Sequence, residues 1–453
     1  MRLPNACLAL VLACSAPLAA QPPSLARLAA RIESAARDLI ATKKTPSLSV
    51  AISQKGRTVY ARAFGSADLE QHVAARPGTV YLIGSITKQF TAAAILGLVE
   101  EGALSLDDSL GKFFPAWPAA TRAVTVRQLL NHTSGIKDYT NVPRWLRLMA
   151  LPLPPDSMIA LFRDEPTDFA PGTEWRYDNS GYYLLGLIIE KAAGEPYPKH
   201  LERRLFAPLG LHATRYCSSR PVVPDRAPGY SATPAGFENA APISLDQAFA
   251  AGAICSTASD LLAWTRALQS GRVIKPASYK LMTTPIPLPG GKAQTYGFGL
   301  SVGTFSGHRM ISHNGGINGF NAQMASYPDD SLIVAVLVNV ESGEADKFER
   351  KVSRWALGIP DEVVKDLPVA EADAARLVGK YAQGETQVEL RLDDGHLVLL
   401  GIGAPTKLLH QGGGQFRIES NPELRVTFPG AGAKADQMVV VTPGGSLTLP
   451  RVP

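Results

Sequence analysis

Residues 81–90 read Tyr81-Leu82-Ile83-Gly84-Ser85-Ile86-Thr87-Lys88-Gln89-Phe90, an apolar strand-like piece that passes through a glycine into a helical pattern. If the helix begins at Ser85, a spacing of three residues places the Lys88 ammonium one turn above the Ser85 hydroxyl, on the same face. The start of a helix offers free N–H groups, and a desolvated lysine loses proton affinity. The stretch therefore predicts a serine nucleophile beside its base.

The Ser-x-x-Lys pattern alone is weak, because it also occurs at residues 109–112 and 134–137. An apolar helical face continues behind Ser85 through residues 86–98, whereas the other two matches lie among glycines and turns. The structural alternative is that Ser85 only caps the helix and Lys88 faces solvent. Other motifs are needed to decide between these interpretations.

The N-terminus has the pattern of a secretory signal over residues 1–20: Arg2, an apolar run through Ala13, and small residues ending at Ala20. We expect the mature protein to be exported, either periplasmic or secreted. A rival processing site is a lipoprotein box at residues 11–14, in which Cys14 would carry a lipid anchor. No stretch reaches membrane-spanning length without charges.

Composition excludes some partners. The chain has 453 residues and a formal net charge of +5, spread without basic blocks, so we expect neither nucleic acid nor an acidic membrane surface as a partner. Its length is sufficient for two or three domains. The charge and length leave the oligomeric state open.

Two of the four cysteines, Cys7 and Cys14, lie in the leader. The other two, Cys217 and Cys255, belong to an exported chain, in which an even count favours a disulfide over two buried free thiols. Two cysteines without a nearby Cys or His partner do not make a zinc site. We therefore expect a disulfide, no metal and no cofactor.

Helix and strand patterns predict a large first domain over residues 21–360. It opens with an amphipathic helix at 24–43 and a hairpin of strands at 48–53 and 57–64. The remaining helix patterns lie at 126–130, 183–193, 197–206, 259–268 and 345–356. The remaining strand patterns lie at 297–305, 309–313, 320–327 and 332–340.

The C-terminal part, residues 367–453, holds only short strand patterns, with a hairpin signal at Asp394-Gly395. It predicts a separate small β-sandwich or barrel.

A second motif, Tyr177-Asp178-Asn179, precedes an apolar helix by a few residues. In an extended loop, positions two apart point the same way, so both side-chain tips would reach one site. Tyr177 near Lys88 would act as a phenolate that takes the serine proton and later activates water, and Asn179 would hold a substrate amide. The structural alternative is a tyrosine with its ring in the core.

The third motif is His313-Asn314-Gly315-Gly316, at the end of a predicted strand. Glycines there would let a substrate carbonyl approach the strand edge, with the Gly316 N–H joining that of Ser85 as an oxyanion donor. His313 would hydrogen-bond the tyrosine or the substrate. The structural alternative is a β-turn with a partly buried histidine.

These three motifs, in this order, resemble the serine β-lactamase and penicillin-binding protein superfamily. The Tyr-x-Asn form, with Leu-Leu-Asn-His-Thr-Ser-Gly at 129–135 and Pro-Gly-Thr at 171–173, resembles the class C β-lactamase group, which includes D-alanyl-D-alanine carboxypeptidases, D-aminopeptidases and esterases. The resemblance covers about residues 25–358. It implies an α+β fold with an antiparallel sheet flanked by helices, and the C-terminal β domain resembles small lipocalin-like appendages of some relatives.

By this resemblance Ser85 is the acylated nucleophile, and Lys88 and Tyr177 are the proton-transfer pair. Substrate would be bound by Asn179, His313 and Gly315, while Ser85 and Gly316 would form the oxyanion hole. Class C β-lactamases have lysine where His313 stands, and a neutral histidine anchors a carboxylate less well.

We therefore expect an exported serine hydrolase that forms an acyl-enzyme on an amide, ester or lactam carbonyl of a small molecule or peptide. The peptidase and esterase branches fit better than efficient β-lactam hydrolysis. The alternative is a binding or sensor protein for peptidoglycan-like or β-lactam ligands that turns over poorly.

Overall fold

The structure is a computed structural model that describes residues 24–218, 220–361, 364–384, 386–401, 405–430, 432–442 and 445–453. The predicted signal peptide and Cys14 lie outside the described residues. Within those residues, no helix is both long and apolar enough to cross a bilayer.

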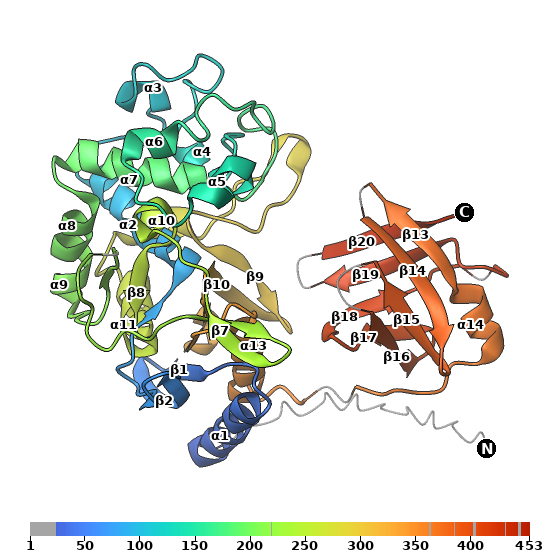
Figure 1. The fold of residues 1–453 in the computed structure, drawn as a ribbon. Helices are drawn as coiled ribbons and strands as arrows, with labels where there is room; N and C mark the ends of the chain where they lie inside the picture. Colours follow the sequence, from blue (N-terminus) through green and yellow to red (C-terminus); the bar gives the residue numbers. More distant parts are fainter. Residues whose placement is uncertain are drawn as a thin grey trace, which may run out of the picture.

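A seven-stranded antiparallel sheet forms the centre of the larger part of the fold, with strand order β3-β2-β1-β12-β11-β10-β9 (Figure 1). Its strands are β1 Ser47–Gln54, β2 Arg57–Asp68, β3 Val73–Ala74, β9 Ser301–Phe305, β10 His308–Ile317, β11 Phe320–Tyr327 and β12 Leu332–Val338. Strand β1 pairs with β12, placing Leu48 opposite Val338. The predicted hairpin and the four later strands therefore join in one sheet, which confirms the expected α+β class.

Helices cover both faces of this sheet because its central strands are apolar on both sides. On one face, α1 (Leu25–Ala41) and α13 (Glu344–Ala356) pack against residues such as Val334 and Val336. The opposite face, with Ile333 and Ala335, packs against a larger helical region. That region contains α2 (Thr87–Glu100), α7 (Asn179–Ala193), α10 (Leu245–Gly252) and α11 (Ala258–Gln269).

Shorter elements complete the helical region. The helices are α3 Leu110–Phe113, α4 Val126–Leu130, α5 Pro143–Leu148, α6 Pro155–Ile159, α8 Tyr197–Leu201, α9 Ala207–Leu209 and α12 Pro276–Met282. Two small sheets are formed by β4 (Tyr81–Leu82), β8 (Ile254–Ser256) and β5 (Arg215–Tyr216), and by β6 (Tyr230–Thr233) and β7 (Gly236–Asn239). The predicted helix at 197–206 is divided, since a π-helical turn at Glu202–Phe206 follows α8.

Several predicted boundaries need correction; strand β9, for example, begins at Ser301 and not at residue 297. Helix α7 begins at Asn179, not at residue 183, because its first turn, Asn179-Ser180-Gly181, is polar or small and shows no apolar periodicity. The prolines of segment 151–171 are typical of an irregular connection, but the segment contains the short helix α6, which starts at a proline. In addition, α10 had no sequence signal of its own.

The C-terminal strands close into an eight-stranded barrel among the described residues, so the barrel alternative is correct and the sandwich is not. The strands are β13 Gly379–Gln383, β14 Thr386–Asp393, β15 His396–Leu400, β16 Thr406–Gly412, β17 Gln415–Ile418, β18 Asn421–Thr427, β19 Gln437–Thr442 and β20 Gly445–Val452, after helix α14 Glu371–Leu377. Strand β13 was not predicted because its burial is confined to Tyr381. The domain limits at residues 360 and 367 stay predictions.

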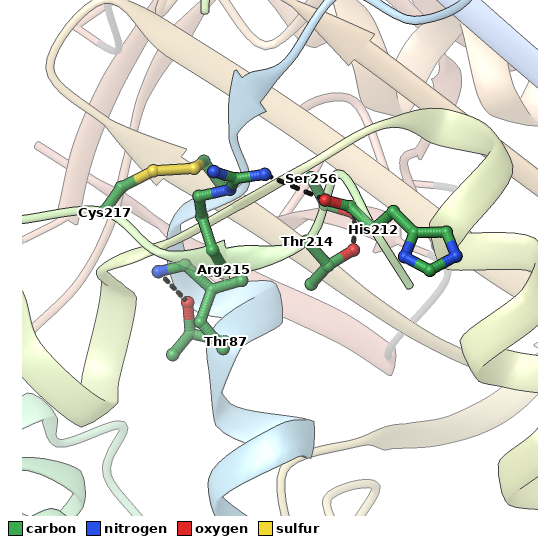
Figure 2. The surroundings of a disulfide bond; sticks show 8 residues. Thr87, His212, Thr214, Arg215, Cys217 and Ser256 are labelled. Atoms are coloured by element: carbon green, nitrogen blue, oxygen red, sulfur yellow. Dashed lines mark hydrogen bonds between the residues drawn. A yellow bond between two sulfur atoms is a disulfide. The ribbon is translucent and has the colours of Figure 1, made fainter. Parts of the chain in front are cut away.

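The expected disulfide between Cys217 and Cys255 is present (Figure 2). Cys255 lies in β8, where it is paired with Leu82 of β4, the strand that leads into Ser85. The Ile254 N–H also donates to Thr87 Oγ1 at 3.1 Å. The disulfide therefore braces the strand that supports the start of α2.

Candidate active site

Ser85 lies in a single 3₁₀ turn, Gly84–Ile86, and the α-helix itself starts at Thr87. The predicted helix start at Ser85 is therefore corrected by two residues. Gly84 has φ +50°, a conformation that favours glycine, and a Cβ there would lie 2.9 Å from the Gly316 nitrogen. This close approach places the turn that carries Ser85 against strand β10.

Lys88 is buried in the first turn of α2, with an exposed fraction of 0%. The structure thus excludes the alternative of a solvent-facing lysine. Its Nζ lies 3.1 Å from Ser85 Oγ, 2.8 Å from Asn179 Oδ1 and 2.9 Å from the Ala251 carbonyl oxygen. The last two groups only accept hydrogen bonds, so they take two N–H donors of the amine. A neutral Lys88 therefore keeps its lone pair for the Ser85 hydroxyl.

Burial changes the proton affinity of Lys88 in the direction that a base requires. Desolvation lowers its pKa to about 7, and the carboxyls of Asp138 and Asp178 only partly oppose this effect. A substantial fraction of the amine is then uncharged near neutral pH. Ser85 therefore has a proton acceptor within hydrogen-bonding distance.

The two other Ser-x-x-Lys matches have different surroundings. Lys112 forms an exposed ion pair with Asp108 at 2.7 Å, and Lys137 pairs with Asp168 at 2.8 Å. Both lysines thus contact a carboxylate, whereas Lys88 is fully buried and contacts the Ser85 hydroxyl.

Tyr177 lies beside Lys88, whose Nζ is 4.7 Å from the centre of the tyrosine ring. The phenol hydroxyl is buried and has no hydrogen-bond partner of regular geometry among the described residues. Desolvation raises the pKa of Tyr177 above its ordinary value, with a smaller opposing interaction from Ser85. The geometry therefore favours a neutral phenol at rest, in place of the expected phenolate, and leaves Lys88 as the resting base.

Asn179 connects Lys88 to a carboxyl group. It is the first residue of α7, and its Nδ2 donates to Asp138 Oδ2 at 3.1 Å while its Oδ1 accepts from Lys88. These two contacts fix the orientation of the amide. The predicted role of Asn179 in holding substrate stays a prediction.

The middle residue of the Tyr-x-Asn motif, Asp178, has a buried carboxyl and lies beside the buried imidazole of His132. The Asp178 N–H donates to His132 Nδ1 at 3.1 Å, and Asp178 Oδ2 accepts from Ser134 Oγ at 3.1 Å. Desolvation, followed by the charge of Asp138, raises the pKa of Asp178 to about 8. Desolvation and the nearby Lys88 hold the pKa of His132 well below its ordinary value.

His313 lies within β10, not at its end, and is 3% exposed. Its Nδ1 lies 2.6 Å from the Asn314 carbonyl oxygen and its Nε2 lies 2.8 Å from the Tyr296 hydroxyl. A carbonyl only accepts, so Nδ1 carries the proton and Nε2 accepts from Tyr296. Desolvation, with a smaller effect of Lys88, lowers the pKa of His313 to about 3. His313 is therefore a neutral, fully paired side chain.

The two glycines after Asn314 bring β10 against the nucleophile turn. A Cβ on Gly315 would collide with the Ile83 carbonyl and lie 3.2 Å from the Ser85 nitrogen, whereas a Cβ on Gly316 would meet open space. Only glycine at 315 allows this approach. The arrangement brings Ser85 and Gly316 to one place, as the predicted oxyanion hole requires, and the role itself stays a prediction.

Sequence reasoning did not identify Tyr296, Asp138 or the Ala251 carbonyl as parts of the site. Ala251 belongs to α10, in which Phe249 has φ +39° and ψ −127°. The two carbonyl groups that follow this interruption accept hydrogen bonds from side chains of α2. The Ala250 carbonyl accepts from Thr91 Oγ1 at 2.7 Å, and the Ala251 carbonyl accepts from Lys88 Nζ. Every residue has a backbone carbonyl, so contacts of this kind cannot be predicted from residue types. Among the described residues, no group of three or more His, Cys, Asp or Glu is placed to hold a metal ion.

Comparison with known proteins agrees with this geometry. A D-aminopeptidase from Brucella anthropi is 30% identical over 369 residues, covering 81% of this chain and 69% of that protein. Penicillin-binding protein 4* from Bacillus subtilis is 29% identical over 402 residues, covering 84% and 86%. The octameric penicillin-binding protein homologue from Pyrococcus abyssi is similar in structure, with a TM-score of 0.68 and 26% identity over 93% and 99% of the two chains.

The fold and these relatives define a serine hydrolase of the β-lactamase and penicillin-binding protein type. The family model described as Beta-lactamase matches residues 32–358. The chain therefore belongs to the beta-lactamase family, as the three sequence motifs indicated.

Proposed function

We propose that this protein is an exported serine amidase that forms an acyl-enzyme on Ser85, with amides and short peptides of D-amino acids as its substrates. The observation that carries the proposal is the 3.1 Å contact between Lys88 Nζ and Ser85 Oγ, in a site where burial lowers the pKa of Lys88 to about 7. Lys88 accepts the Ser85 proton as the hydroxyl attacks the carbonyl carbon. Export rests on the leader pattern alone.

The state of His313 supports substrates without a free carboxylate next to the scissile bond. A carboxypeptidase or β-lactam substrate presents a carboxylate, which a positive side chain holds best. His313 is neutral and both of its ring nitrogens are paired, so it supplies neither a charge nor a free donor. D-Amino-acid amides and N-terminal peptide bonds need no cation at this position. The D-aminopeptidase relative from Brucella anthropi favours the same substrate class.

In the proposed reaction Ser85 Oγ forms a bond to the substrate carbonyl carbon while Lys88 takes its proton. The tetrahedral oxyanion is held by the Ser85 and Gly316 N–H groups, and the amine then leaves with a proton relayed through Tyr177. Water then attacks the carbonyl carbon of the acyl-enzyme and gives up a proton along the same path in reverse. The bond to Ser85 Oγ breaks, and the proton returns to that oxygen. No residue outside the described site is required for these steps.

The test is turnover by purified protein of D-phenylalanine amide, its L-enantiomer, a p-nitrophenyl ester and nitrocefin. We expect the highest kcat/KM for the D-amide, and loss of turnover and of fluorophosphonate labelling in Ser85→Ala. Ser109→Ala is the matched control, because Ser109 begins another Ser-x-x-Lys match, and it should retain both. Labelling of Ser85→Ala at the wild-type level would disprove the nucleophile, and nitrocefin as the best substrate would disprove the substrate class.

Mass spectrometry after a single turnover separates a hydrolase from a sensor. A hydrolase returns to the unmodified mass within the time of one catalytic cycle, whereas a sensor keeps an adduct on Ser85. A long-lived adduct with every amide in the panel would favour the alternative of a binding protein.

A further inference from the structure

A cavity of about 670 Å³ lies between α11 and the end of the central sheet at which the β1–β2 and β11–β12 connections are found. Its wall includes Ser53 at the end of β1, Arg309 near the start of β10, and Pro328 and Ser331 between β11 and β12. None of Ser85, Lys88, Tyr177 and His313 lines it. The cavity is therefore separate from the nucleophile.

Three arginines, Arg266, Arg272 and Arg309, line this cavity, and no Asp or Glu is among its lining residues. Guanidinium groups keep their charge at any physiological pH, so the cavity carries a concentrated positive potential. No carboxylate in the described part of the chain forms an ion pair with any of the three. The acidic residues nearest to the lining residues in sequence are Asp329 and Asp330. The Asp330 carboxylate contacts His308 instead of the cavity arginines, with Oδ2 at 2.9 Å from His308 Nδ1.

The partners of these arginines are few. The Arg266 side chain donates one hydrogen bond, from Nη1 to Thr58 Oγ1 at 3.2 Å, and burial lowers its pKa. Within the described residues the side chains of Arg272 and Arg309 have no hydrogen-bond partner. Each guanidinium has five N–H donors, and Arg272 and Arg309 are exposed, so most of the arginine donors at this cavity remain available to an acceptor.

A buried hydroxyl adds a second, independent observation. Ser53 is 1% exposed, lines the cavity, and its Oγ has no hydrogen-bond partner among the described residues. It lies on the α11 side of the sheet, because Ala51, two residues earlier in β1, packs in the core on that side. A buried hydroxyl without a partner is unfavourable, so a ligand oxygen at the cavity wall would stabilise it by accepting its hydrogen bond.

We propose that this cavity binds a small molecule carrying phosphate or carboxylate groups, held by Arg266, Arg272 and Arg309 with Ser53 as a neutral donor. Planar guanidinium groups match the paired oxygens of both anions. Successive side chains of a strand point to opposite faces of the sheet, so residues 309, 311, 313 and 315 of β10 share one face. Arg309 of the cavity and His313 of the candidate active site therefore lie on the same face. Arg309 and His313 are separated by about 13 Å along the strand, at roughly 3.3 Å per residue.

The probes are pyrophosphate and citrate, with sodium chloride at the same ionic strength as the reference. Binding to the full chain is measured by calorimetry and by the rise in Tm, which a ligand that binds only the folded state produces. We expect both probes, or one of them, to bind and to raise Tm above the chloride reference. A preference for pyrophosphate would identify a phosphate ligand, and a preference for citrate a carboxylate ligand.

The variant Arg272→Gln/Arg309→Gln removes two exposed charges and should weaken binding about tenfold or more, because each charge-assisted contact is lost. Ser53→Ala should weaken it by a smaller factor. The matched control is Arg27→Gln/Arg220→Gln, two exposed arginines outside the cavity, which should bind like the wild type. Equal weakening in both double variants, or no binding of either probe to the wild type, would overturn the proposal. Circular dichroism confirms that each variant is folded.

Discussion

Lys88 Nζ lies 3.1 Å from Ser85 Oγ, and its two other contacts, with Asn179 Oδ1 and the Ala251 carbonyl, consume two N–H donors. The amine can therefore take the Ser85 proton only in its neutral form. Desolvation makes that form accessible, since it lowers the pKa of Lys88 to about 7. The nearby carboxyls limit how far this pKa falls.

The first prediction concerns the pH dependence of kcat/KM. Below pH 7 the Lys88 ammonium has no lone pair, so we expect activity toward an amide to rise with pH through about 7 and then level off. Lys88→Arg, which stays charged, should lower kcat by about 10² to 10⁴. Lys112→Arg is the control, because Lys112 is exposed and paired with Asp108. A profile that is flat between pH 5 and 8 would contradict the role of Lys88.

The second prediction concerns the pair of Tyr296 and His313. Tyr296→Phe leaves the buried Nε2 of His313 without its donor, which should reduce the free energy of unfolding by about 1–3 kcal/mol. The imidazole beside the glycines of β10 should also be less well oriented, so kcat/KM should fall. Urea unfolding and amide turnover measure the two effects.

Tyr60→Phe is the matched control for that substitution. The Tyr60 hydroxyl is buried and has no partner among the described residues, so its removal should leave the stability unchanged or slightly higher. An equal loss of stability in Tyr296→Phe and Tyr60→Phe would contradict the prediction, because the loss could then not be assigned to the hydrogen bond between Tyr296 and His313.

The third prediction concerns the disulfide. Cys217 and Cys255 are 38 residues apart, and cross-linking a loop of this length stabilises the folded state by about 3 to 4 kcal/mol on the chain-entropy model. Cys217→Ser/Cys255→Ser should lose most of this stability. Because Cys255 is paired with Leu82, just before the Ser85 turn, we also expect kcat to fall at temperatures below the unfolding transition. Urea unfolding with and without dithiothreitol checks the first effect, since reduced wild type should match the double variant.

The fourth prediction separates the barrel from the rest of the chain. The Arg451 guanidinium donates to the carbonyls of Ala435, Val378 and Arg376 and to the Tyr381 hydroxyl. Arg451→Met removes these bonds at one end of the barrel, and we expect a loss of about 3 kcal/mol or more in barrel stability.

The five tryptophans of the chain all precede residue 360, so their fluorescence does not report on the barrel. In Arg451→Met the far-ultraviolet dichroism should show an early unfolding transition that the fluorescence lacks. Lys380→Met, at an exposed position of β13, serves as the control. A parallel shift of both signals in Arg451→Met would show that the two parts unfold together.

The sequence alone predicted the candidate site residues and the fold to which they belong. Ser85, Lys88, Tyr177, Asn179 and the His313 motif are local patterns whose order is readable in one dimension. The strand patterns at 48–53 and 332–340 predicted two strands that the structure places side by side in the central sheet. The pair of cysteines outside the leader predicted the disulfide.

Only the tertiary structure decided the protonation states and the supporting contacts. Complete burial lowers the pKa of Lys88. One of its N–H donors is taken by the backbone carbonyl of Ala251, which is 163 residues away in the sequence. The neutral state of His313 depends on its burial, with a smaller effect of Lys88, and the close fit of Gly315 depends on the turn that carries Ser85. The arginines of the second cavity likewise come from β10, from α11 and from the residues after it. Such effects arise from long-range packing and desolvation, which the order of residues does not display.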